Sequence, residues 1–69
     1  MNPIKDAQLK VQEILKIANE LLILLQKENV DYEEADQLIF MIDQYSIELE
    51  GEVGLAKEIE IGYYKLENS

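Results

Sequence analysis

Apolar residues recur at helical spacing from Ile4 to Leu25, and this pattern restricts the start of the chain to an amphipathic helix. The main apolar face repeats every seven positions, with a second set of residues between its members: Ile4, Val11, Ala18 and Leu25, with Ala7, Ile14 and Leu21. Asn2 suits the N-cap, and Pro3 suits the first helical position, where no backbone N–H is needed. The sequence predicts a helix over residues 4–28.

A second helix is predicted over residues 32–50. Asp31 is followed three residues later by Glu34, which is a capping-box spacing, and the Asp31 side chain can accept backbone N–H groups there. The inward face is expected to contain Ala35, Leu38, Ile42, Tyr45 and Leu49. Gly51 is interpreted as the residue that follows the end of this helix.

A third helix is predicted over residues 55–67, where Leu55, Ile59, Tyr63 and Leu66 share one face. The alternative is a strand, because Ile59, Ile61 and Tyr63 alternate with Glu60 and Gly62. A single strand would have no partner for its backbone hydrogen bonds, so the pattern favours the helix.

The expected fold class is all-α, a three-helix bundle built as a long helical hairpin plus a shorter third helix, in one domain over residues 1–69. So short a chain buries only about 60% of the surface that it exposes when unfolded. It has no Cys and no His, which excludes disulfides and the usual zinc sites. We therefore expect it to dimerise into a larger bundle.

The residues expected to mediate self-association lie in the second half of the first helix. Residues 21–25 are apolar on every side of a helix, which favours burial against more than one neighbour. The predicted self-association residues are Ile17, Leu21, Ile23 and Leu24.

The charge balance limits the classes of partner. Fifteen Asp and Glu face six Lys, Arg is absent, and the net charge is −9. Residues 28–60 alone carry −10, from eleven carboxylates and Lys57. Nucleic acids and anionic membranes would be repelled, so neither is expected as a partner. The electrostatics favour a protein partner with a basic surface.

The residue types needed for most enzyme chemistry are missing. There is no His to act as a general base, no Cys nucleophile and no Arg to bind phosphate. Asp31-x-Glu33 faintly resembles the start of a calcium loop, but Asp36 and Ile42 occupy the positions that would need Gly and Glu. We expect no catalysis, no cofactor and no metal.

Two large apolar residues on the second helix do not fit its inward face. Phe40 and Ile47 lie on the opposite side, seven residues apart, among Asp36, Asp43 and Glu50. These five residues, which we name the docking stripe, are predicted to bind a partner. Two alternatives stay open: the third helix covers the two apolar residues, or they join two copies of the chain.

Residues 14–45 resemble a family of small acidic helical hairpins from spore-forming bacteria that act on a response-regulator phosphorelay. The likeness is carried by Asp36-Gln37-Leu38-Ile39, which is similar to the family's Leu-Asp-x-Leu-Ile. The resemblance implies a helical hairpin. The family's Ser-Gln-x-x-Leu-Asp signature is replaced here by Glu33-Glu34-Ala35-Asp36, so its phosphatase activity is not carried over.

These observations predict a non-catalytic protein–protein interaction or regulatory module that associates with itself. The alternative is an acidic antagonist, such as a DNA mimic, immunity protein or antitoxin, that covers a basic site on its target. No signal peptide and no apolar run of about 20 residues is visible, so a cytoplasmic location is expected.

Overall fold

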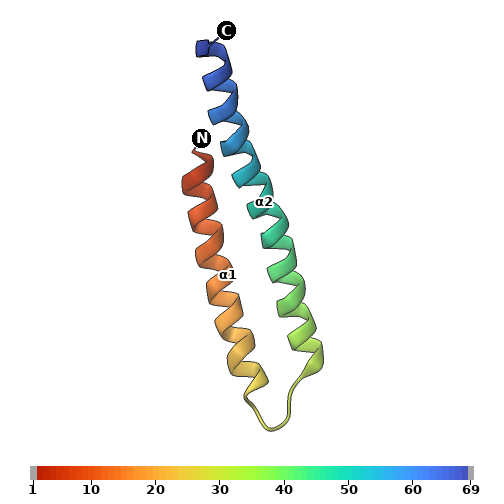
Figure 1. The fold of residues 1–69 in the computed structure, drawn as a ribbon. Coiled ribbons are helices and arrows are strands. Elements are labelled where there is room, and N and C mark those ends of the chain that lie inside the picture. Colours follow the sequence, from red (N-terminus) through yellow and green to blue (C-terminus); the bar gives the residue numbers. More distant parts are fainter. Residues whose placement is uncertain (1, 69) are drawn as a thin grey trace.

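The chain folds into an antiparallel hairpin of two helices, α1 (Pro3–Leu25) and α2 (Tyr32–Asn68), joined by the loop 26–31 (Figure 1). The structure is a computed structural model that describes residues 2–68, and the side chains of residues 2–62. The all-α class predicted from the sequence is confirmed, as is the hairpin. The predicted third helix does not exist as a separate element.

Helix α1 begins where the sequence predicted. The Asn2 side chain accepts a hydrogen bond from the Lys5 backbone N–H at 3.2 Å, and Pro3 occupies the first turn. The helix ends at Leu25, three residues before the predicted end. There the backbone N–H of Gln26 donates to the carbonyl oxygens of Leu22 and Ile23, both at 3.2 Å.

Helix α2 begins with the predicted cap. The Asp31 side chain accepts a hydrogen bond from the Glu34 N–H at 3.2 Å, and the Asp31 carbonyl accepts one from the Ala35 N–H at 3.0 Å. Glu33 and Glu34 place two carboxylates in the first turn, where the helix dipole is positive. This cap sets the point at which the chain turns back along α1.

We expect Asp31→Ala to lower the free energy of unfolding by about 1 kcal/mol, because it removes an acceptor for an otherwise unpaired N–H. Urea denaturation followed by circular dichroism measures the change. Asp31→Asn is the matched control, since its side-chain oxygen keeps the cap and should preserve most of the stability. If Asn costs as much as Ala, the cap is not the source of the stabilisation.

Helix α2 continues through Gly51 and Gly54, so the predicted end at Gly51 is wrong. Neither glycine has the positive φ of a helix C-terminal cap. Residues 55–67 are the continuation of α2, and the alternative of a strand over residues 58–64 is excluded. The side chains of Tyr63 and Leu66, assigned to the third helix, lie outside the described residues.

The reason for this continuation is the spacing of residues along the contact with α1. The partly covered positions of α2 run from Leu49 through Glu52 to Ala56 at steps of three and four, past both glycines. Each glycine costs up to about 1 kcal/mol in helix propensity. Contact with the first turns of α1 offsets this cost, and no proline forces a break.

The core is a narrow seam between the two helices. Its buried residues are Ala7, Ile17 and Leu24 of α1 and Ala35 of α2. Ile14 and Leu21 are half-buried in α1, and the predicted inward face of α2 is confirmed as a row of buried or half-buried residues: Ala35, Leu38, Ile42, Tyr45 and Leu49. The seam has the heptad spacing of an antiparallel coiled coil.

The main apolar face predicted for the first helix packs on α2 through only one of its two sets, in which Ala7 is buried and Ile14 and Leu21 are half-buried. Ile4, Val11, Ala18 and Leu25 are all exposed, whereas Ile17 is only 4% exposed. The exposed set and the set that contains the buried Ile17 and Leu24 each repeat every seven residues, and the two sets lie on neighbouring sides of the helix. Helix α1 therefore carries two neighbouring apolar faces, and α2 covers one of them.

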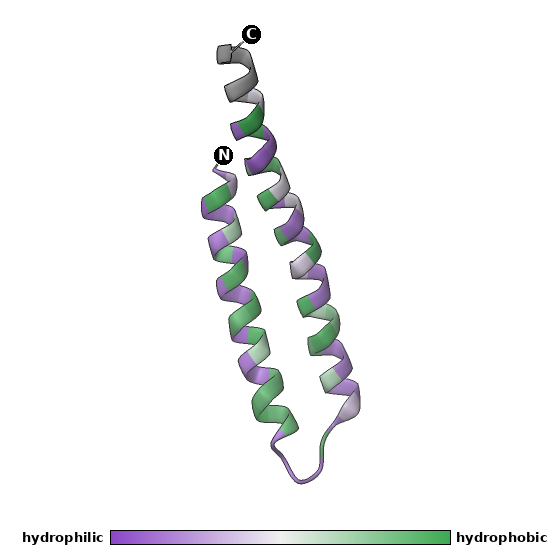
Figure 2. Ribbon diagram, viewed as in Figure 1, coloured by the Kyte–Doolittle hydropathy of each residue, from purple (hydrophilic) through white to green (hydrophobic). Residues whose placement is uncertain are grey.

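The hairpin is long and thin, with extents of 61 × 16 × 15 Å. Helix α2 is longer than α1 and runs on beyond the start of α1 (Figure 1). In the coloured ribbon, the end of α1 next to the loop is apolar over its last turns (Figure 2). Most side chains of so thin a molecule lie at its surface.

Candidate protein-interaction surfaces

The docking stripe lies on the outer side of α2. Phe40 is 63% exposed and Ile47 is 62% exposed, and Asp36, Asp43 and Glu50 are exposed beside them. They lie on the opposite side of the helix from the seam that contacts α1. Because α2 is one continuous helix, the alternative in which a third helix covers Phe40 and Ile47 is wrong.

Three of the four residues predicted to mediate self-association lie in the seam within the hairpin. Ile17 and Leu24 are each 4% exposed, and Leu21 is half-buried. Their apolar surface is already in contact with α2 of the same chain. Ile23 is 53% exposed and lies on the outer side of α1, so the structure does not bring it together with the other three.

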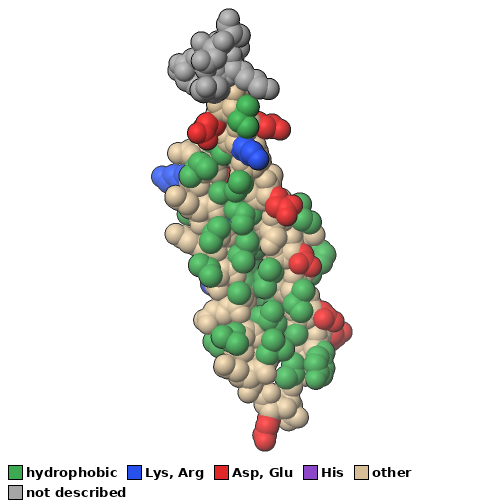
Figure 3. Space-filling view, viewed as in Figure 1, with side chains coloured by type: hydrophobic (Ala, Val, Ile, Leu, Met, Phe, Trp, Pro, Cys, Tyr) green, Lys and Arg blue, Asp and Glu red, His purple; other side chains and the backbone are tan. Residues whose placement is uncertain are grey.

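A second apolar surface covers one side of the hairpin, and it includes four residues of the main apolar face predicted for the first helix. We define the apolar face as these exposed residues of α1 and α2: Ile4, Val11, Leu15, Ala18, Leu22 and Leu25, with Ile39 and Val53. Figure 3 shows apolar side chains spread across both helices on this side. A groove of ≈ 550 Å³, lined by Ile4, Ala7, Gln8, Val11, Gln12, Leu49 and Val53, runs between the helices here.

Carboxylates border the apolar face on its α2 side. Asp36, Asp43 and Glu50 recur every seven residues and follow the same edge of the helix. Acidic side chains lie along the outer edge of α2 in the space-filling view (Figure 3). The docking stripe and the apolar face therefore meet at this row of carboxylates.

The opposite side of the seam is charged. Lys10 extends from α1 toward α2, where its Nζ atom lies 2.6 Å from Glu48 Oε2 and 4.9 Å from the centre of the Tyr45 ring. The hydrogen bond to Glu48 raises the pKa of the Lys10 ammonium group, partly opposed by desolvation. This contact links α1 to α2 on the charged side of the seam.

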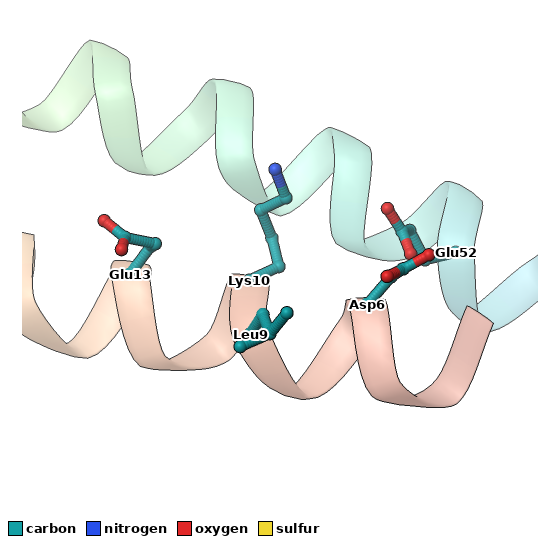
Figure 4. A pocket seen from close by; sticks show the side chains of 5 residues that line it. All are labelled: Asp6, Leu9, Lys10, Glu13 and Glu52. Carbon is teal, nitrogen blue, oxygen red and sulfur yellow. The ribbon is translucent and has the colours of Figure 1, made fainter. Parts of the chain in front are cut away.

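A shallow hollow of ≈ 210 Å³ lies beside this contact, lined by Asp6, Leu9, Lys10, Glu13 and Glu52 (Figure 4). Its carboxylates come from both helices, and Lys10 projects between them toward α2 (Figure 4). In the part of the chain that the structure describes, no three acidic side chains converge as the ligands of a metal ion would. The described helices also include none that is long and apolar enough to cross a bilayer.

Comparison with protein-family models, curated proteins and solved structures found no match to this chain. The hairpin and its exposed surfaces are therefore the basis for proposing a function.

Proposed function

We propose that this chain is a small acidic protein–protein interaction or regulatory module that has no catalytic activity and works by association, both with itself and with a protein partner. One observation carries the proposal. Sixteen large apolar side chains among the described residues are at least 40% exposed, whereas only four residues are buried. Scattered exposed apolar residues are ordinary, but contiguous ones mark surfaces that contact another molecule.

The chemistry of the chain supports association over catalysis. Its residues include no His, Cys or Arg, so the usual general bases, nucleophiles and phosphate clamps are missing. What the molecule offers instead is a rigid helical surface with apolar anchors and a strong charge. Such surfaces suit recognition of another helical or basic protein.

The docking stripe is our candidate for the foreign partner. Phe40 and Ile47 are the apolar anchors, two turns apart, and a partner groove could enclose both. Asp36, Asp43 and Glu50 would attract a basic rim around that groove and speed up the encounter. The stripe thereby combines the apolar centre and polar border found in specific interfaces.

We expect the double variant Phe40→Ala/Ile47→Ala to lose the foreign partner while keeping its helix content and melting temperature, because both side chains are exposed. The measurement is affinity purification from the native host beside the wild-type chain, followed by the Kd of the recovered partner. A loss of about 10- to 100-fold in affinity is expected for two anchor residues.

Leu9→Ala/Ile23→Ala is the matched control, since these two exposed apolar residues of α1 lie away from the carboxylate row. It should bind the partner as the wild type does. If the Phe40/Ile47 variant retains full affinity, the docking stripe is not the binding surface.

A second candidate function is an acidic antagonist that covers a basic site on its target. The row formed by Asp36, Asp43 and Glu50, within a segment of charge −10, favours it. The two candidates differ in their response to salt. The affinity of an antagonist held by carboxylates should fall steeply as ionic strength rises, whereas binding through Phe40 and Ile47 should change little.

A further inference from the structure

We infer that the apolar face is covered by a second copy of this chain, so that two hairpins form a four-helix bundle. This inference rests on the proposed function and specifies which surface performs the self-association. The residues proposed to join the two copies are now those of the apolar face. The predicted Ile17, Leu21 and Leu24 are not available, because their apolar surface already contacts α2 of the same chain.

The exposed area of the hairpin is the first argument. Its accessible surface is 5777 Å², for a mass of 8.0 kDa. A compact monomer of that mass would expose about 4,450 Å², so the hairpin exposes roughly 1,300 Å² more. A stable protein interface buries about 800 Å² on each partner. The excess is therefore large enough for one complete dimer interface.

The composition of the apolar face is the second argument. No charged residue occupies its α1 part, and the polar side chains of α1 that line the groove, Gln8 and Gln12, are uncharged. Ile4 and Val53 line the same groove, so they lie at one level of the hairpin. Two helical turns further toward the loop, the same spacing pairs Val11 with Ser46, and the next such step pairs Ala18 with Ile39.

These pairs are the layers from which a four-helix bundle is built. Each layer supplies one residue from each helix, and a second hairpin supplies the other two. Small Ala18 beside larger Ile39 leaves room for an apolar side chain of the second copy. A basic partner, in contrast, would place its charges against an uncharged surface on α1.

The third argument is the small core. Among the side chains that the structure describes, two of the four buried ones belong to alanines, Ala7 and Ala35, which contribute little apolar area. Domains of this size need additional stabilisation, and the chain has no Cys to form a disulfide. If the hairpin needs a molecule on its apolar face to stay folded, that molecule must be present wherever the chain is made. A second copy meets this condition at any concentration above the Kd of the dimer.

Charge makes the proposal distinguishable from binding to a basic protein. Each copy carries −9, so two copies repel one another, and salt screens that repulsion. Self-association should thus become tighter as salt is raised. Association with a basic partner that is held by the carboxylates should become weaker.

The test introduces carboxylates into the face. We expect wild-type chain to sediment as a dimer, with a lower Kd at about 500 mM than at about 20 mM salt. Val11→Glu/Leu22→Glu should raise that Kd at least about 100-fold, because dimerisation would bury two unpaired charges. Leu9→Glu/Ile23→Glu adds the same charge to α1 at two exposed positions outside the apolar face and should remain dimeric.

A milder pair, Val11→Ala/Leu22→Ala, covers the case in which the Glu variant does not fold, and should raise the Kd about 10-fold or more while keeping helical circular dichroism. A folded wild-type chain that stays at 8.0 kDa at every salt concentration would overturn the inference. A wild-type chain that dimerises, but whose Val11/Leu22 variants dimerise equally well, would also overturn it. The latter result would leave the proposed function standing, whereas a monomer that binds no protein would refute both.

Discussion

Leu24→Ala is expected to lower the free energy of unfolding by about 2–5 kcal/mol, which is the range for truncating a buried Leu. Leu24 is 4% exposed and is one of two large side chains that are buried among residues 2–62. Domains of this size have a total stability of the same order. The variant should therefore lose a large part of its stability at 25 °C, and urea denaturation followed by circular dichroism will measure the loss.

The neighbouring residue supplies the control for this prediction. Ile23→Ala removes a side chain of similar size from the same turn of α1, but Ile23 is 53% exposed. Its replacement should change the stability by less than about 0.5 kcal/mol. Both variants must be compared at several protein concentrations, because dimerisation would add to the apparent stability. Equal losses at the two positions would mean that α1 packs on α2 through a different face.

The ends of elements set by local hydrogen bonds could be predicted from the sequence. Asn2, Pro3 and Asp31 each have a side chain that satisfies or removes a backbone donor at the start of a helix. Such signals depend on the residue and its immediate neighbours, so no knowledge of the tertiary fold is needed. The start of each helix follows from them.

The choice of the packed face could not be predicted in the same way. Ile17 and Val11 both belong to sets that repeat every seven residues, and their helical positions differ by about 120°. Periodicity reports that a face is apolar, but not which neighbour covers it. On α2 the ambiguity was smaller, because Asp36 and Asp43 separate Phe40 and Ile47 from the inward row.

The docking stripe, too, could be predicted only in part. That Phe40 and Ile47 lie opposite the inward face of α2 follows from helical spacing alone. Their exposure did not follow from it, because it depends on whether a third helix packs there. The length of α2 decides the matter, and the two glycines gave the wrong signal for that length.

Gly51→Pro is expected to lower the free energy of unfolding by about 3 kcal/mol or more, because proline inside a helix removes a hydrogen bond and clashes with the preceding turn. Had the second helix ended at Gly51, as its sequence suggested, the cost would be small. The expected structural result is loss of helix beyond residue 50, measured by circular dichroism and by amide hydrogen exchange of residues 51–62.

Gly51→Ala is the matched variant, and its effect has the opposite sign. A methyl group built at Gly51 meets no atom within 4 Å, and the residue has helical backbone angles. Alanine should therefore raise the free energy of unfolding by about 0.5–1 kcal/mol, the difference in helix propensity. At a left-handed cap the same change would be destabilising, since alanine rarely adopts a positive φ. A loss of stability with Gly51→Ala would show that α2 ends at this residue, and Phe40 and Ile47 would then again have a third helix available to cover them.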